Sequence, residues 1–246
     1  MLASSRQRSC LTPSLAADAR WTMNYWTVTA RITAKDLVSE ARTRDAFNAM
    51  LFFALLVIVI FSFSFQPTTE AERRMAGGLL WVAFLFAGLI VLDRSFLRER
   101  VNECLDALRL SPAPPGAIFL GKCLANFLFL LAAELVLIPL FLVFFDLSIR
   151  GDAGAALSVL LLGTWALVIN GTFFAAMTAN LRSREVMLPL LLVPISVPAL
   201  IAVVEASASL LLGEESVGSW LQMLIGFDLI YTTLSLVLFK TVLESA

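Results

Sequence analysis

The stretch AFNAMLFFALLVIVIFSFSF, residues 46–65, decides the fold. It carries no charged side chain, and Gln66 and Pro67 follow directly after it. A helix of about 20 mostly apolar residues is long enough to cross the hydrocarbon core of a bilayer. This stretch therefore predicts a transmembrane helix.

Five further windows have the same apolar character: residues 77–92, 123–145, 153–179, 186–204 and 220–242. Only 15% of the 246 residues are charged, whereas soluble domains average about 25%. The chain is therefore predicted to be an all-α integral membrane protein with six transmembrane helices in residues 46–246. Pro189, Pro194 and Pro198 each remove a backbone donor from the fifth span, which predicts a kinked helix there.

The distribution of basic residues predicts the orientation of the spans. With the amino terminus inside the cell, fifteen of the 18 Lys and Arg residues face the cytoplasm, and only Arg73, Arg74 and Arg150 face outward. Cytoplasmic loops carry the excess of Lys and Arg in membrane proteins. Both termini are therefore expected in the cytoplasm of a multi-pass protein.

Two segments precede the first span. Residues 1–22 are polar and lack a continuous apolar run, so they are either a disordered tail or a mis-called start before Met23. Residues 23–45 predict an amphipathic helix in the cytoplasmic interface, the alternative being an ordinary solvated helix. Its apolar stripe consists of Trp26, Ile32, Ala34, Leu37, Val38 and Ala41.

The longest predicted cytoplasmic loop, residues 93–122, contains a short amphipathic helix. Its apolar face holds Leu97, Val101, Cys104, Leu105 and Leu108, and its acidic face holds Glu99, Glu103 and Asp106. Pro112, Pro114 and Pro115 then stop the helix and stiffen the return to the third span. We expect this coupling helix to dock a cytoplasmic partner, the alternative being a surface helix that packs on the bundle.

Residues 116–123, GAIFLGKC, fall one residue short of the phosphate-binding pattern G-x-x-x-x-G-K-[ST]. Cys123 replaces the hydroxyl that would contact magnesium, and prolines stand where a buried strand should precede the loop. The chain is therefore not expected to bind ATP. Lys122 is predicted to be an anchor at the cytoplasmic interface.

Two carboxyl groups fall inside predicted spans, Glu134 in the third and Asp228 in the sixth. A carboxylate at mid-bilayer costs about 2.5–3.5 kcal/mol on insertion scales. Each is therefore expected to face protein or a wet cavity, where it lines a translocation path or joins helices. Asn126 and Asn170 are candidate donors of interhelical hydrogen bonds.

Several long stretches, taken in order, resemble one known family. They are AMLFFALLVIVIFSFSF from Ala49, GGLLWVAFLFAGLIVLDRSF from Gly77, LGKCLANFLFLLAAELVLIPLF from Leu120 and REVMLPLLLVPISVPALIA from Arg184. Together with the loop before Lys122, they resemble the haem exporter protein B family, CcmB, whose members have the type-2 ABC exporter permease architecture. The resemblance begins near Tyr25. Glu103 departs from the family pattern, in which glycine is more usual.

This resemblance implies a permease subunit of the cytochrome c maturation system in the bacterial inner membrane, with residues 46–246 as the permease domain. A separate CcmA-like ATPase would dock on the coupling loop and hydrolyse ATP. CcmC- and CcmD-like haem-handling proteins and a second permease copy would be further partners, and haem would be the substrate.

Composition excludes several other functions. The chain has no histidine, its three cysteines form no CxxC pair, and its net charge is −1. Histidine-based catalysis, a histidine-ligated metal and a nucleic-acid partner are therefore not expected, and neither is an enzyme activity. A type-2 permease for a drug, lipid or polysaccharide remains an alternative, as does an ATP-independent secondary transporter, although the two halves show no convincing repeat.

Overall fold

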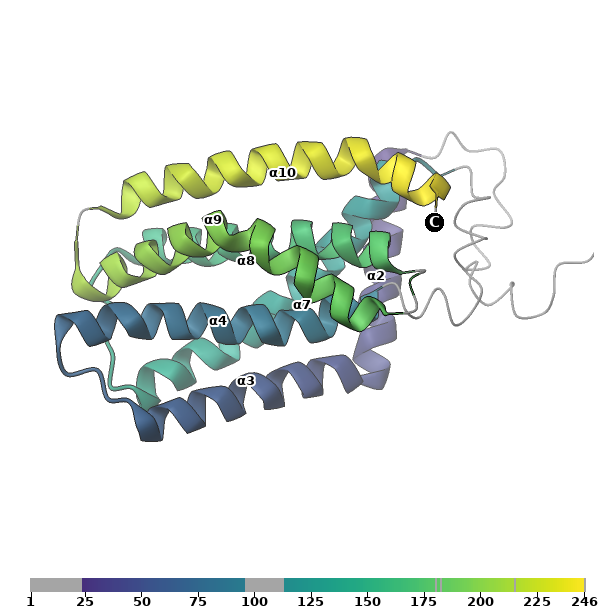
Figure 1. Cartoon of the computed structure of the whole chain (residues 1–246). Helices are drawn as coiled ribbons and strands as arrows, with labels where there is room; N and C mark the ends of the chain where they lie inside the picture. Colours follow the sequence, from purple (N-terminus) through teal and green to yellow (C-terminus); the bar gives the residue numbers. More distant parts are fainter. Residues whose placement is uncertain (1–23, 96–112, 180, 182, 215, 246) are drawn as a thin grey trace, which may run out of the picture.

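The computed structural model describes residues 24–95, 113–179, 181, 183–214 and 216–245. The elements in this part of the chain are all helical (Figure 1). Their bounds are α2 Tyr25–Thr43, α3 Asp45–Ser64, α4 Glu70–Ser95, α7 Pro115–Phe144, α8 Ala153–Thr178, α9 Arg184–Leu212 and α10 Val217–Ser245.

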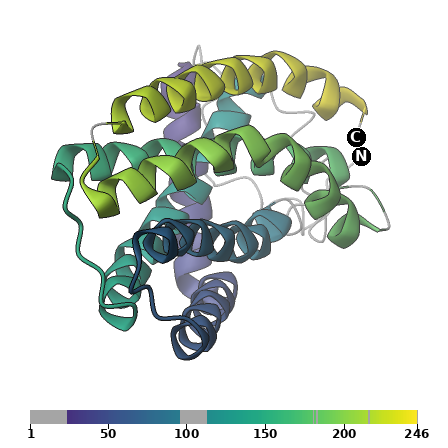
Figure 2. The ribbon, with the colours of Figure 1, turned by 60° about the vertical axis from the view of Figure 1, so that its left-hand side comes forward.

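Six of these helices run alongside one another, and α2 lies across one end of the bundle (Figure 1). The same arrangement is clear after rotation (Figure 2). We call this end the α2 end and the opposite one the far end. The connections from α3 to α4, from α7 to α8 and from α9 to α10 lie at the far end, so α10 returns the chain to the α2 end.

The turn from α2 into α3 is built at Arg44, whose backbone takes the left-handed conformation with φ 56°. The Arg44 N–H donates to Glu40 O at 2.7 Å and so caps α2. The Glu40 side chain then accepts hydrogen bonds from the first N–H groups of α3, at Ala46 (3.1 Å) and Phe47 (3.3 Å). These groups have no partner within a helix, and satisfying them holds the corner between the two helices.

α8 is the central helix of the bundle, packing against α4, α7, α9 and α10. Two glycines let α4 come close to it. A methyl group at Gly163 would lie 2.5 Å from the Trp81 ring, and one at Gly171 would lie 2.3 Å from Leu92. The core of the protein is therefore the contact between α8 and the helices around it.

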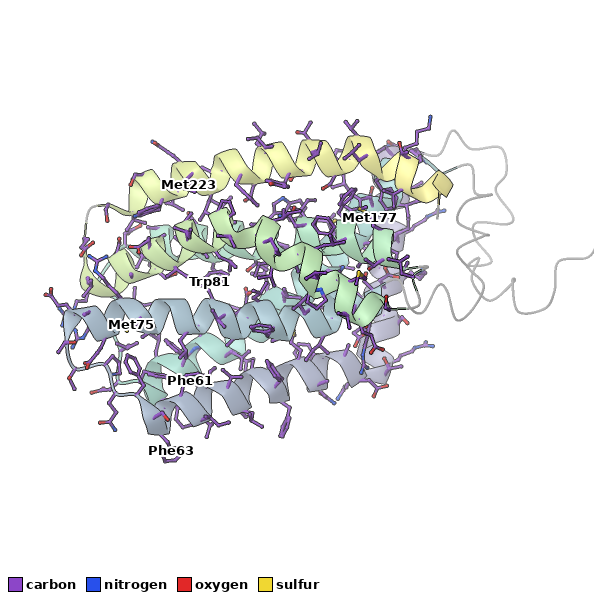
Figure 3. The ribbon with its side chains drawn as sticks, in the orientation of Figure 1. Phe61, Phe63, Met75, Trp81, Met177 and Met223 are labelled. Carbon is purple, nitrogen blue, oxygen red and sulfur yellow. The ribbon has the colours of Figure 1, made fainter. Side chains whose placement is uncertain are left out.

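The outer surface of the bundle is strongly apolar. Phe63 is 87% exposed and Val143 79% exposed, and Figure 3 shows Phe63 projecting outward while Trp81 lies among the helices. Large apolar side chains at this density are expected where a protein faces lipid. All six long helices are also long and apolar enough to span a membrane.

The predicted six-helix membrane fold is confirmed, with corrections to its boundaries. α4 begins at Glu70 instead of residue 77, and α7 begins at Pro115 instead of residue 123. The fifth span stays helical through Pro189, Pro194 and Pro198, and both ribbon views show α9 curved. The predicted coupling helix lies outside the described residues.

Candidate functional site

The predicted partner-docking loop leaves the bundle and returns to it at the α2 end. Leu97, Glu99, Val101, Glu103, Leu105, Asp106, Leu108 and Pro112 lie outside the described residues. The described ends of the loop are Ser95, the last residue of α4, and Pro115, the first residue of α7. Proline is favoured at this first position because its φ is already helical and its missing N–H would have no partner. The segment predicted to lead from the loop back to the third span is therefore already the first part of α7. The predicted loop of residues 93–122 is too long, because α4 ends at Ser95 and α7 begins at Pro115.

A buried polar cluster joins the two ends of this loop. Lys122, two turns into α7, is only 1% exposed. Its ammonium group donates to Ser95 O at 3.0 Å and to Asp36 Oδ2 at 3.3 Å. The prediction that Lys122 anchors the chain at the interface is therefore wrong, because α2 covers it and supplies a carboxylate partner. Removing a buried ammonium from water is costly unless it is paired in this way.

Asn126 extends the cluster by one further turn of α7. Its Nδ2 donates to Thr172 Oγ1 on α8 at 2.9 Å and to Ser95 Oγ at 3.1 Å. Asp36, Ser95, Lys122, Asn126 and Thr172, which we call the Lys122 cluster, therefore join α2, α4, α7 and α8. No pattern in the sequence predicts Asp36, Ser95 or Thr172 as site residues, because nothing local indicates contacts between such distant segments.

α2 is seated directly on the first two turns of α7. Thr29 Oγ1 donates to Ala117 O at 3.3 Å, and Thr33 Oγ1 donates to Gly121 O at 2.9 Å. A side chain at Gly121 would meet Ile32 at 2.8 Å, so only glycine allows this approach. Burial at the start of the same interface raises the pKa of the Tyr25 hydroxyl.

The two faces of α2 differ in their surroundings. Val28 and Thr29 are buried against the bundle, whereas Trp26 is 68% exposed and Val38 53% exposed. An exposed tryptophan and valine on a helix that lies across the ends of the spans suit the boundary between lipid and water. Within the predicted apolar stripe, Ile32 packs against the bundle, whereas Trp26 and Val38 are exposed, so the stripe is divided between the bundle and its surroundings.

Glu134 lies buried at the contact between α7 and α8. Its Oε2 is 2.6 Å from the Thr164 hydroxyl, and its Oε1 has no hydrogen-bond partner among the described residues. The side chain lines a cavity of about 10 Å³ together with Met50, Phe84 and Leu137, which is at the lower limit for one water molecule. Glu134 thus joins two spans through a partner, Thr164, that the sequence did not indicate.

The remaining polar candidates do not join the Lys122 cluster. Asn170 Nδ2 donates to Ala166 O at 3.0 Å, one turn earlier in its own helix, instead of the expected neighbour on another span. Asp228 is 6% exposed, and neither of its carboxyl oxygens has a hydrogen-bond partner among the described residues. One turn along α10, Thr232 accepts a 3.0 Å hydrogen bond from Trp165.

A larger cavity of about 480 Å³ lies toward the far end, between α4, α7, α8 and α9. Its walls are apolar and include Trp81, Phe84, Pro139 and Leu157. The indole N–H of Trp81 donates to Ser207 Oγ at 2.8 Å, so this polar group is already satisfied within the protein. Among the described residues, no three His, Cys, Asp or Glu side chains are grouped to hold a metal ion.

Comparison with known proteins places this chain in a family. A family model described as "CcmB protein" matches residues 27–244, which include all of the described helices except the first two residues of α2 and the last residue of α10. The chain is 36% identical over 170 residues to "Heme exporter protein B" of Rhodobacter capsulatus, covering 69% of this chain and 78% of the relative. It is 34% identical over 193 residues to the protein of the same name from Pseudomonas aeruginosa, covering 78% and 86%. The chain therefore belongs to the CcmB family.

Proposed function

We propose that this protein is the membrane-spanning permease subunit of an ABC transporter that exports or releases haem for cytochrome c maturation. The observation that carries the proposal is the family match over residues 27–244, which covers nearly all of the described helices. Two relatives named haem exporter protein B are 36% and 34% identical to this chain over 78% and 86% of their own length. Haem is the substrate in this proposal and is not held as a resident cofactor.

The proposal places the α2 end in the cytoplasm and the far end outside the bacterial inner membrane. In this orientation fifteen Lys and Arg residues lie on the cytoplasmic side and three on the outer side, which agrees with the usual excess of basic residues in cytoplasmic loops. Of the three at the far end, Arg74 forms ion pairs with Glu205 and Glu214, so part of the outward positive charge is neutralised locally. Both chain termini are then cytoplasmic.

A separate CcmA-like ATPase is the proposed source of energy, docking on the loop between α4 and α7. Ser95 and Pro115, where the described helices meet this loop, both lie at the α2 end. The proposed docking residues are the apolar positions Leu97, Val101, Leu105 and Leu108 and the acidic face of Glu99, Glu103 and Asp106, which is offered outward to the partner. CcmC- and CcmD-like proteins and a second permease copy complete the proposed assembly.

The direct test is genetic complementation in a bacterial strain that lacks the corresponding permease gene. Expression of this chain together with its cognate ATPase should restore c-type cytochromes, measured as haem-stained bands after electrophoresis. An ATPase variant unable to hydrolyse ATP is the matched control and should restore none. Restoration that is equally complete without a working ATPase would exclude an ABC permease and favour a secondary transporter.

A further inference from the structure

We propose that Lys122 is a positioning residue that ties both ends of the ATPase-docking loop to α2, so that α2 moves with the loop when ATP is hydrolysed. The proposal rests on the proposed function, because it assumes that a partner ATPase acts at this loop. It assigns to α2 a role in energy coupling beyond that of a helix lying in the interface.

The first observation is the position of the Lys122 ammonium group between three elements. Ser95 O belongs to the last residue of α4, where the loop begins, and Lys122 itself follows the end of the loop in α7. Asp36, on α2, is the acidic partner, and its side chain is 19% exposed. An ammonium group has three donors, which lets one side chain hold a carbonyl and a carboxylate from different helices.

The second observation is burial. The Lys122 side chain is 1% exposed, so its charge cannot turn to water when a partner withdraws. Breaking a buried pair leaves an uncompensated charge, which is strongly unfavourable. α2 and the two loop ends are therefore expected to keep their contact while the loop moves. Lys35 offers a contrast on the same carboxylate: it pairs with Asp36 at 3.3 Å, but its side chain is 38% exposed.

The third observation is that the contact continues into the core. Asn126 links Ser95 to Thr172 on α8, and the Gly121–Ile32 approach leaves no space for α2 to slide over α7. Closely packed elements transmit displacement because they have few voids to absorb it. A push on the loop is therefore carried to α2 and to the central helix together.

The test uses the full complex with its ATPase, in cells and after purification into lipid. Lys122→Met keeps the length of the side chain and removes its donors, and Asp36→Asn removes the charge of the partner. Lys35→Met is the matched control, because it removes an exposed lysine that pairs with the same carboxylate. Lys122→Arg is the conservative variant, which keeps charge and donors.

We expect Lys122→Met to lower haem-stained cytochromes about tenfold, the scale typical of coupling mutations. The ATPase should still co-purify, and ATP hydrolysis should continue at close to the wild-type rate. Lys122→Arg should restore a substantial part of the output, and Lys35→Met should match wild type. Wild-type cytochrome levels with Lys122→Met, or a parallel loss of hydrolysis and cytochromes in a complex that remains assembled, would overturn the proposal.

Two further arms keep the outcome unambiguous. If Lys122→Met does not accumulate in the membrane, Asp36→Asn decides the matter, and normal cytochrome output with this variant would overturn the coupling role. If wild-type protein with its ATPase fails to restore cytochromes, the proposed function fails. The coupling role is then tested separately with two spin labels, one at Val38→Cys on α2 and the other at the far end. The measurement is whether the distance between the two labels changes when ATP is added. No ATP-dependent change would overturn it.

Discussion

The Thr164 hydroxyl lies 2.6 Å from Glu134 Oε2 and 2.7 Å from the carbonyl oxygen of Leu160 in its own helix. A hydroxyl has one proton to donate, so it satisfies only one of these two acceptors. The other contact is satisfied when Glu134 carries a proton and donates it to the Thr164 oxygen. We therefore expect Glu134 to be a neutral carboxylic acid that donates to Thr164 while Thr164 donates to Leu160.

The first prediction follows from the expected neutral state of Glu134. Glu134→Gln should leave assembly and cytochrome output close to wild type, because the glutamine amide can also donate to Thr164. Infrared spectroscopy of the wild-type protein should show the carbonyl band of a protonated carboxylic acid that is missing from this variant. A band already absent in wild type would contradict the assignment, and a large loss of cytochromes would place Glu134 on the transport route.

The energy of the Glu134–Thr164 contact can be measured by a double-mutant cycle. Glu134→Leu, Thr164→Val and the double variant should give a coupling free energy of about 0.6–1.7 kcal/mol, the range of interhelical hydrogen bonds in membranes. The measurement is unfolding of the purified protein in detergent. Additive effects of the two single changes would show that the contact contributes no stability.

The docking loop gives a prediction about assembly. Leu105→Asp with Leu108→Asp should release the ATPase in detergent pull-downs while the permease remains inserted, because two charges would replace the apolar face of the docking helix. Ile149→Asp is the control, since Ile149 lies in the far-end connection and is 44% exposed. Undiminished co-purification of the ATPase with the double variant would refute docking through this face.

Orientation can be tested with two matched serines, both exposed and both in connections between helices. Ser148 lies at the far end and Ser183 at the α2 end. After the three native cysteines are replaced with serine, a membrane-impermeant maleimide should label Ser148→Cys in intact spheroplasts. Ser183→Cys should be labelled only after lysis. The reverse pattern would remove the loop from reach of any cytoplasmic ATPase.

The seat of α2 on α7 predicts a contrast between two glycines. Gly121→Ala should destabilise the protein by about 1–3 kcal/mol, the usual cost of overpacking, because the new methyl group would lie 2.8 Å from Ile32 and 3.0 Å from Thr29 O. Gly226→Ala should be neutral or stabilising, since a methyl group there meets nothing within 4 Å. Equal unfolding midpoints for the two variants would contradict the observed packing.

The spans could be predicted because the bilayer acts on each segment separately. Residues 46–65 must be apolar wherever their neighbours lie, and α3 begins and ends within one residue of that window. The starts of α4 and α7 could not be predicted in this way, because a hydropathy pattern identifies only the part of a helix that lies within the hydrocarbon layer. A helix can continue beyond that layer, as α4 does from Glu70.

The Lys122 cluster could not be predicted, because its contacts depend on how the helices pack. Asp36 and Lys122 are 86 residues apart, and a lysine at the end of an apolar window is normally exposed at the interface. Only the crossing of α2 beneath α7 brings the two side chains together. Thr164 gave no signal either, since a threonine within a span can place its hydroxyl on the carbonyl oxygen one turn back in its own helix.

The packing of α2 on α7 also constrains the order in which the helices can assemble during synthesis. α2 leaves the ribosome before α3 and α4, yet its binding surface is on α7, which is synthesised much later. Until then Val28 and Ile32 have no partner in the bundle, and the headgroup region of the bilayer is the surface available to them. Newly made α2 is therefore expected to rest on lipid first and to dock only when the third span has been inserted. Docking of α2 is thus delayed until α7, which ends at Phe144, has been made, when more than half of the 246 residues have been synthesised.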